Sequence, residues 1–158
     1  MFIVIDFDLT SPMSNETSKL FLPDQVCFPM YASSRMITRL YQPLLEEFDL
    51  TYPQYLVMLV LWQEKKLSVS ELCQRLYLKT NTLTPLLKKM KVKQLIKKQR
   101  SKEDERTVHI VLTDKGKALE EAAKNVPAQL IASLNMSDKD IEQMRSLMWK
   151  FLDGVGGN

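Results

Sequence analysis

The stretch that decides the fold spans residues 67–112 and reads LSVSELCQRLYLKTNTLTPLLKKMKVKQLIKKQRSKEDERTVHIVL. Ser68 stands three residues before Glu71, which is the spacing of a capping box and predicts a helix over residues 69–76. A second helix is predicted over residues 81–93, because leucines and a methionine recur there on one face. Only a short turn separates the two. This is the pattern of a helix-turn-helix.

A hairpin is expected directly after the second helix. Leu95–Arg100 and Thr107–Leu112 suit strands, and the segment between them, SKEDE, is charged and turn-like. Helix, short turn, helix and basic hairpin is the order of a winged helix-turn-helix.

The rest of the chain is expected to be mostly helical. Thr51 before Gln54 and Ser137 before Asp140 mark two more helix starts. The expected helices outside the first stretch cover residues 22–48, 52–65, 114–134 and 138–153. The predicted fold class is mainly α with a small β-hairpin wing, in which N- and C-terminal helices form a dimerisation region.

Residues 1–20 differ from the rest, because weak alternation gives way to Ser, Pro, Asn and Thr. We interpret them as an N-terminal extension, with Met13 as one possible natural start and a short added strand as the alternative. Residues 21–158 are expected to form one domain. Its DNA-binding winged helix would cover about 52–112, and its dimerisation helices about 22–48 and 114–155.

Residue counts disfavour several classes of protein. No glycine precedes Gly116, so a Gly-rich phosphate loop cannot be built in the first 115 residues. His109 is the only histidine, which leaves neither a metal-ligand set nor a Ser-His-Asp set. We therefore expect no metal, no cofactor and no enzyme. Two cysteines suit a reducing, cytoplasmic compartment, and the longest apolar run, 55–62, is far shorter than the ~20 residues that span a bilayer.

Charge is unevenly distributed along the chain. Between Arg75 and Arg106, eleven Lys or Arg stand against three Asp or Glu, a net charge of +8, whereas the remainder carries −5 and the whole chain +3. A local basic cluster of this kind is typical of a surface that docks on nucleic acid.

The polar face of the second helix is the expected reading surface for double-stranded DNA. At its N-terminal end the free amides and the helix dipole favour a phosphate oxygen, and its lysines add attraction without sequence information. The alternative is a set of solvated caps and surface lysines. The candidate residues are Thr80, Asn81, Thr82, Thr84, Lys88 and Lys89.

The hairpin adds Arg100 and, two residues apart, Asp104 and Arg106. Alternation in a strand places Asp104 and Arg106 on the same face, so the carboxylate can orient a guanidinium that enters a narrow minor groove. The alternative is an exposed ion pair with little energetic consequence.

Several motifs together resemble a known family. The segments LSVSEL (67–72), LTPLLKK (83–89), RSKEDER (100–106) and LTDKG (112–116) are similar to those of the MarR family of dimeric winged-helix repressors, over about residues 20–153. Within it, VCFPMY (26–31), YQPLL (41–45) and LTYPQY (50–55) resemble the organic-hydroperoxide-sensing branch, which includes OhrR and SarZ-like regulators.

The resemblance implies a homodimeric repressor that leaves its operator when an organic hydroperoxide oxidises Cys27. Tyr31, Tyr41 and Tyr52 would be the phenols that hydrogen-bond the reactive sulfur. Because Cys73 is not expected to act as a resolving cysteine, either a small thiol or further oxidation of Cys27 would complete the switch. The resemblance also assigns the recognition helix to Thr80–Lys91 and the minor-groove contact to Arg106 with Asp104.

Two departures from the branch concern the recognition helix. Lys79-Thr80-Asn81 replaces Asp-Ser-Gly at its start, which leaves the operator sequence open. Gln94 stands where a glycine usually ends it, which requires either a left-handed cap without glycine or a longer last turn.

The spacing of Cys27 and the tyrosines supports a sensor independently. Cys27, Tyr31 and Tyr41 lie at i, i+4 and i+14, on one side of a helix whose cap we expect at or near Asp24. The positive end of the helix dipole favours the thiolate of Cys27. Tyr41 is ~21 Å away along the helix. Only an antiparallel partner subunit brings it to Cys27.

Other readings compete with this one. Cys27 as a small buried hydrophobe is the plain alternative, and Cys73 is expected on a core face in the same role. A regulator that binds a small aromatic ligand at the dimer cleft is the second function, and a thiol peroxidase that uses Cys27 is the third.

Overall fold

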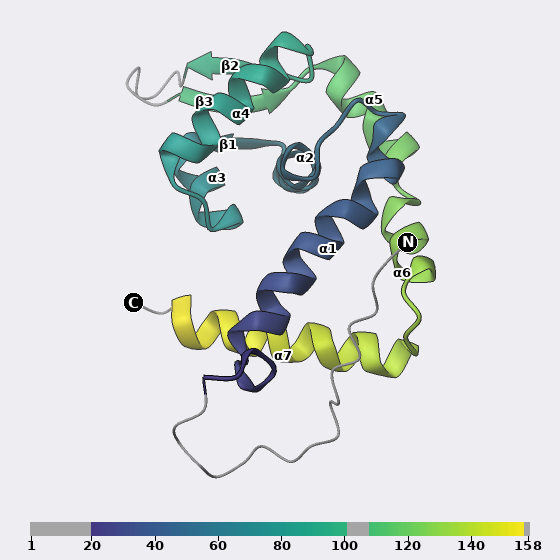
Figure 1. Ribbon diagram of the computed structural model, residues 1–158. Helices are drawn as coiled ribbons and strands as arrows, with labels where there is room; N and C mark the ends of the chain where they lie inside the picture. Colours follow the sequence, from purple (N-terminus) through teal and green to yellow (C-terminus); the bar gives the residue numbers. More distant parts are fainter. Residues whose placement is uncertain (1–19, 101–107, 157–158) are drawn as a thin grey trace.

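The computed structural model describes residues 20–100 and 108–156 (Figure 1). A helical scaffold surrounds a small sheet at one end of the molecule, while α7 lies at the opposite end and α1 runs between them. The elements in chain order are η1 Leu22–Asp24, α1 Cys27–Glu46, α2 Tyr52–Glu64, β1 Lys66–Ser68, α3 Val69–Leu76, α4 Thr80–Val92, β2 Ile96–Arg100, β3 Val108–Leu112, α5 Asp114–Ala123, α6 Val126–Ser133 and α7 Asp138–Gly156.

The predicted winged helix-turn-helix is confirmed, with one more strand than expected. The antiparallel sheet has the order β1-β3-β2, and Ile110 at its centre pairs with Leu67 on one side and Lys98 on the other. Strand β1 was missed because its three residues merge directly into the cap of α3. Ser68 caps that helix as predicted: its hydroxyl accepts from the Glu71 amide at 3.2 Å, and the Glu71 carboxylate accepts from the Ser68 amide at 2.7 Å.

Helix α2 forms the centre of the core, and Figure 1 shows it end-on between the sheet and α1. It carries apolar residues around much of its circumference, which is typical of a buried helix. The buried residues of α2 are Gln54, Tyr55, Val57, Met58, Leu61 and Trp62. The inward face of α4, Leu83, Leu87 and Met90, is buried as its spacing predicted.

The end of α4 uses a left-handed residue that is not glycine. Gln94 has φ 60°, and the Leu95 amide donates to the Met90 carbonyl at 3.1 Å. Of the two alternatives for this helix end, the structure therefore takes the left-handed cap without glycine.

The single helix predicted over residues 114–134 is wrong. The chain forms α5 and α6 instead, and Pro127 stands in the first turn of α6. A proline has no amide hydrogen and clashes with the carbonyl four residues earlier, here that of Ala123, so a continuous helix ends where α5 does.

The start of α1 also differs from expectation. The N-cap is Val26, no side chain caps the helix, and Asp24 belongs to the short turn η1. Cys27 nevertheless occupies the first turn, because it is the first residue of the helix.

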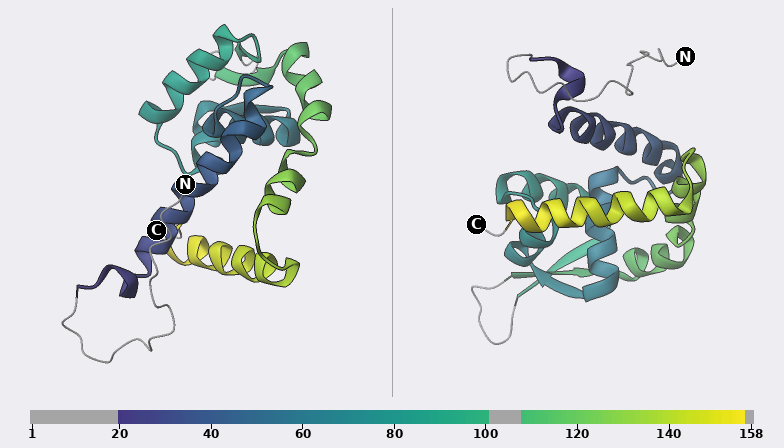
Figure 2. Two further views of the ribbon diagram at one scale, coloured as in Figure 1. Left: turned by 45° about the vertical axis from the view of Figure 1, so that its right-hand side comes forward. Right: turned by 90° about the horizontal axis from the view of Figure 1, so that it is seen from below.

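Helices α1 and α7 are unevenly covered. Helix α1 packs on α2 and α6, whereas α7 buries no residue and crosses the far end of the molecule (Figures 1 and 2). Large apolar side chains on α7 are exposed, among them Leu147, Met148, Trp149 and Phe151. The predicted N-terminal extension and the Asp104–Arg106 pair lie largely or wholly outside the described residues.

Candidate functional site

The outer face of α4 presents the polar residues that the sequence singled out. Helix α4 begins at Thr80, and Lys79 is its N-cap. The polar side chains of Thr80, Asn81 and Thr82 therefore lie at the positive end of the helix dipole. The six residues predicted for this face, all exposed, are Thr80, Asn81, Thr82, Thr84, Lys88 and Lys89.

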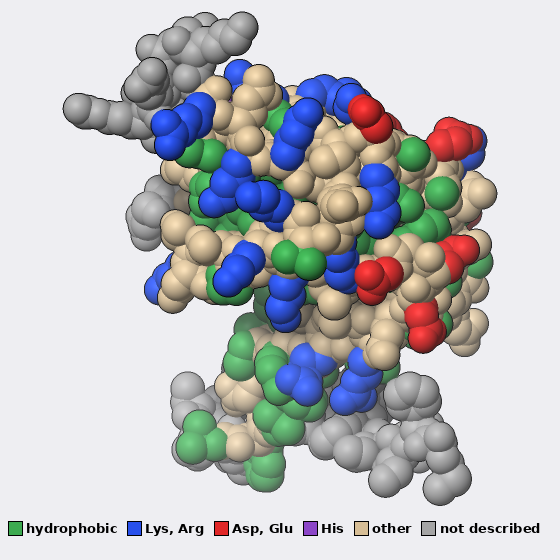
Figure 3. Space-filling model, turned by 90° about the horizontal axis from the view of Figure 1, so that it is seen from above, with side chains coloured by type: hydrophobic (Ala, Val, Ile, Leu, Met, Phe, Trp, Pro, Cys, Tyr) green, Lys and Arg blue, Asp and Glu red, His purple; other side chains and the backbone are tan. Residues whose placement is uncertain are grey.

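A basic surface continues from α4 onto β2. Viewed from above, Lys and Arg side chains gather over this part of the molecule, while acidic side chains lie towards one edge (Figure 3). A hollow of about 240 Å³ lies between the helix and the strand, and Lys88, Lys91, Lys97 and Lys98 are among its lining residues. Arg100 ends β2 and is exposed.

Cys27 and Tyr31 occupy adjacent turns at the start of α1. Both are exposed, Tyr31 by 60% of its surface, and the guanidinium carbon of Arg35 lies 5.6 Å from the centroid of the Tyr31 ring. The thiol thus stands at a helix N-terminus with a phenol one turn away. This half of the predicted site comes from α1 alone.

Tyr41 and Tyr52 form the other half. Their rings stack at 4.5 Å between centroids with 21° between planes, and Tyr55 lies 5.6 Å from Tyr41. Burial, with the neighbouring Tyr52 and Tyr55, raises the pKa of Tyr41 to about 12, and burial also raises the pKa of Tyr52. Both phenols are therefore neutral near pH 7 and able to donate hydrogen bonds.

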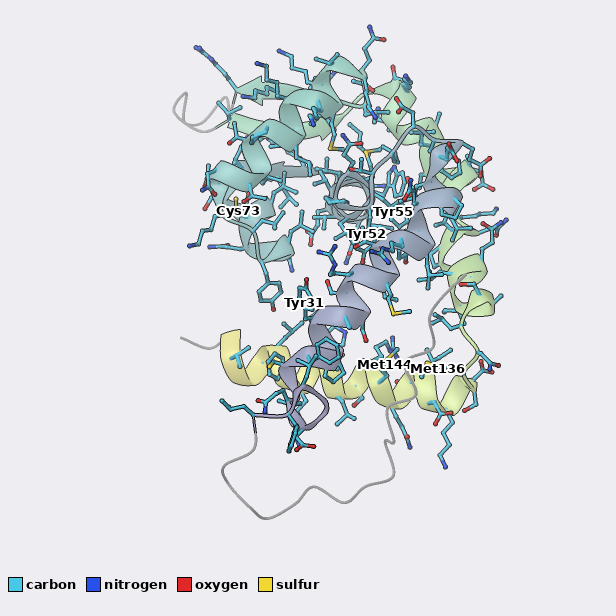
Figure 4. The ribbon with its side chains drawn as sticks, in the orientation of Figure 1. Tyr31, Tyr52, Tyr55, Cys73, Met136 and Met144 are labelled. Atoms are coloured by element: carbon cyan, nitrogen blue, oxygen red, sulfur yellow. The ribbon has the colours of Figure 1, made fainter. Side chains whose placement is uncertain are left out.

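The two halves do not meet within one chain. Cys27 and Tyr41 belong to the same continuous helix, α1, and fourteen residues at 1.5 Å each separate them by ~21 Å. Figure 4 shows Tyr52 and Tyr55 where α1 passes α2, with Tyr31 farther along α1 towards α7.

Two aromatic residues behind the tyrosine pair were not singled out from the sequence. Tyr55 is 1% exposed, and its hydroxyl has no hydrogen-bond partner among the described residues. Trp62 lies 6.1 Å from Tyr55 between ring centroids, edge to face. Their spacing, i and i+7 on α2, is a signal of a shared helix face.

Cys73 lies in a different part of the molecule from the tyrosines, on α3 (Figure 4). It is half-buried against the core, as expected for a structural cysteine, and its sulfur is 3.8 Å from the Thr80 hydroxyl.

Known proteins share both the sequence and the fold. The family model "Transcriptional regulator SarA/Rot" matches residues 39–122. The organic hydroperoxide resistance transcriptional regulator of Bacillus subtilis is 42% identical over 141 residues, covering 89% of this chain and 96% of that protein. The chain belongs to the MarR/SarA family of winged-helix transcriptional regulators. The regulator SarZ of Staphylococcus aureus is 34% identical, over 84% of this chain and 93% of its own.

Solved structures of AbfR from Staphylococcus epidermidis are similar in fold to this MarR/SarA-family chain. Reduced AbfR bound to DNA has a TM-score of 0.74 and 30% identity, covering 86% of this chain and 93% of AbfR. AbfR has also been solved in an overoxidised form bound to DNA and in a disulfide form. These relatives are regulators rather than enzymes. In the described residues of this chain, no helix is long and apolar enough to cross a membrane.

Proposed function

We propose that this regulator is a homodimer in the cytoplasm that binds an operator when reduced and releases it when an organic hydroperoxide oxidises Cys27. The fold and the relatives support a DNA-binding regulator of the OhrR and SarZ type. The single observation that carries the sensing proposal is the separation of the exposed Cys27 from the Tyr41–Tyr52 stack along one helix.

The surfaces that one chain leaves uncovered support a dimer. Helix α7 buries nothing and exposes Leu147, Trp149 and Phe151, while α1 exposes Tyr31 and Met36. Apolar patches of this kind are typical of protein interfaces. If two α1 helices pair antiparallel about a two-fold axis, Cys27 of one subunit meets Tyr41 and Tyr52 of the other. We assign the dimerisation region to α1 and α5–α7.

The chemistry needs only the thiolate, the phenols and the peroxide. The sulfur electron pair attacks the terminal oxygen of ROOH, an S–O bond forms and the O–O bond breaks. The alkoxide leaves and takes a proton from the solvent to give ROH. Sulfur is oxidised by two electrons to a sulfenic acid, and the peroxide is reduced by two. The phenol hydroxyls of Tyr31, Tyr41 and Tyr52 donate to the thiolate, and a sulfenic acid in place of the thiolate disturbs those contacts.

Cys27 has no second cysteine of its own chain to complete the reaction nearby. Cys73 lies on α3 beside Thr80, on a different element from either half of the sensor. We infer that a small thiol resolves the sulfenic acid, so that recovery depends on the thiol pool of the cell.

DNA docking uses the basic surface of α4 and β2. Thr80, Asn81 and Thr82 position the helix on phosphate, Thr84 faces the groove, and Lys88, Lys89 and Arg100 neutralise phosphates; all of these residues are exposed. Asp104 and Arg106 lie outside the described residues. From the sequence alone we propose that Arg106 contacts the minor groove with Asp104 as its partner. Two half-sites are read at once, so a change in the distance between two α4 helices weakens binding.

The test uses two mixed dimers, purified by different tags on the two chains. In the first, one chain carries Cys27→Ser and the other Tyr41→Phe; in the second, one chain carries both substitutions and the other none. The rate at which the remaining Cys27 is oxidised by cumene hydroperoxide is followed by mass spectrometry of its peptide.

An intersubunit site requires the first dimer to react at the wild-type rate, because its remaining Cys27 faces an intact Tyr41. The second should react as slowly as the Tyr41→Phe homodimer. The reverse order contradicts the intersubunit site. Tyr77→Phe, which alters an exposed phenol on the winged helix, is the matched control. If a Cys27→Ser homodimer still leaves the operator on peroxide addition, redox sensing at Cys27 is wrong. If wild type stays on the operator after peroxide addition and leaves it on addition of a small aromatic ligand, the small-ligand function is favoured instead.

A further inference from the structure

Helix α2 carries one sensor residue, a core tyrosine and a core tryptophan on one face. Tyr52, its first residue, stacks on Tyr41; Tyr55 follows one turn later, 5.6 Å from Tyr41; and Trp62 packs edge to face on Tyr55 at 6.1 Å. The rings of Tyr41, Tyr55 and Trp62 thus form a continuous row through the core. We call this row the aromatic relay.

The far end of the aromatic relay is hydrogen-bonded to the start of α5. The Trp62 indole N–H donates to the Gly116 carbonyl at 2.9 Å, and this contact is buried. Gly116 itself packs directly on the backbone of Leu95, since an added Cβ would lie 2.1 Å from the Leu95 carbonyl oxygen. No side chain separates α5 from Leu95 at this point.

The same point fixes the end of the recognition helix. The Thr113 amide donates to the Leu95 carbonyl at 3.0 Å, and the Thr113 hydroxyl donates to the Gln94 carbonyl at 2.5 Å. Gln94 and Leu95 close the last turn of α4. Two backbone carbonyls therefore join three helices. The Gly116 carbonyl links α5 to Trp62 of α2, and the Leu95 carbonyl links the end of α4 to Thr113 at the start of α5.

Tyr55, the middle ring of the relay, has a buried hydroxyl without a hydrogen-bond partner among the described residues. The side chain is 1% exposed, and an unsatisfied polar group costs free energy in a packed core. The Tyr41 ring lies 5.6 Å from the Tyr55 ring between centroids, and Tyr41 in turn stacks on Tyr52. If contacts to Cys27 hold those phenols, their release gives the Tyr55 hydroxyl a partner and shifts its ring against Trp62.

We propose that Tyr55 and Trp62 are positioning residues that transmit the oxidation state of the sensor to the recognition helix. The proposal rests on the proposed redox function and adds a route to it: the sensor phenols displace Tyr55, Tyr55 displaces Trp62, and the Trp62–Gly116 hydrogen bond moves the joint of α5 and α4. Both residues act through others, and neither touches DNA or peroxide. Such coupling needs an element with two arrangements, and the proposal gives that part to the relay.

The first test variant is Trp62→Phe, which keeps an aromatic ring and removes the N–H donor. Three quantities are measured for it and for wild type. These are the oxidation rate of Cys27, the operator affinity of the reduced protein, and the operator affinity after oxidation. We expect the first two to stay within about twofold of wild type. The loss of affinity on oxidation should shrink at least about threefold, the scale on which residues between coupled sites act.

Tyr55→Phe is the second variant, because it keeps the ring and removes only the unpartnered hydroxyl, so the fold should survive. It too should show normal oxidation of Cys27 and a weakened loss of DNA binding. Tyr77→Phe, an exposed tyrosine outside the relay, is the control and should respond like wild type. If both relay variants release DNA on oxidation as wild type does, the proposal is wrong.

A spectroscopic measurement needs no change in the relay itself. The chain has two tryptophans, so in Trp149→Phe the emission comes from Trp62 alone. Oxidation of this variant should change the Trp62 emission, whereas an unchanged spectrum at full oxidation of Cys27 would overturn the relay. Failure of the proposed function looks different, because wild type would then stay on the operator after oxidation.

Discussion

Gly116 packs directly on the backbone of Leu95, and replacing it by alanine should lower the free energy of unfolding. The added Cβ would lie 2.1 Å from the Leu95 carbonyl oxygen and 3.2 Å from Cδ2 of Leu112. The oxygen belongs to backbone that accepts the Thr113 amide, so it cannot retreat without stretching that hydrogen bond. In an open helix, glycine to alanine would gain about 0.5–1 kcal/mol. Overpacking a core costs about 1–3 kcal/mol, and a weakened hydrogen bond costs about 1 kcal/mol. We expect a net loss of about 1–3 kcal/mol.

The assay is urea unfolding followed by circular dichroism, at one fixed protein concentration because a dimer gains apparent stability with concentration. Gly154→Ala on α7 is the control, since nothing of the same chain lies within 4 Å of its added Cβ. That variant should unfold at the same urea concentration as wild type or at a slightly higher one. If Gly116→Ala matches the control with an unchanged slope, the close approach of α5 to Leu95 is not a constraint.

Three further predictions concern the core, the buried phenols and the DNA-binding surface. Leu72→Ala removes a fully buried side chain and should cost about 2–5 kcal/mol in urea unfolding. Burial raises the pKa of Tyr41 from 10.0 to about 12, so the stability that its neutral form contributes is complete below pH 10 and is lost as the pH rises through about 12. Tyr41→Phe should therefore lose less stability than wild type between pH 10 and 12, and an equal loss would contradict the assignment. Arg106→Ala should weaken operator binding in a mobility shift with the dimer intact, and wild-type binding should weaken steeply with salt; a flat salt dependence would exclude the α4–β2 surface.

The parts of the fold that were predicted from the sequence depend on neighbours close in the chain. Ser68 and Glu71 form a helix cap within four residues, and the leucine spacing of α4 fixes its inward face within four turns. The hairpin strands β2 and β3 are joined by one short segment. Local geometry decides each of these elements, so the pattern of residue types is enough to locate them.

The features that sequence reasoning missed depend on contacts between distant segments. Strand β1 is three residues long and exists because it pairs with β3, some forty residues later. The Trp62–Gly116 hydrogen bond joins residues 54 apart. The break between α5 and α6 was missed for a different reason. Pro127 is a local signal for the end of a helix, but the helical spacing of apolar residues continues on both sides of it.

The candidate sensor shows how helix rigidity limits what one chain can do. Cys27 and Tyr41 share an α1 of 20 residues, and hydrogen bonds along that helix keep them ~21 Å apart whatever the side chains do. A sensor that needs both residues must then take one from a second subunit. In the proposed dimer, the spacing of the two recognition helices depends on the same pairing, so sensing and DNA reading would share one interface. Dilution of the reduced protein below the concentration at which it dimerises should therefore weaken operator binding and slow Cys27 oxidation together. If Cys27 of the monomer is still oxidised at the full rate, the sensor does not need the second subunit and the intersubunit arrangement is wrong.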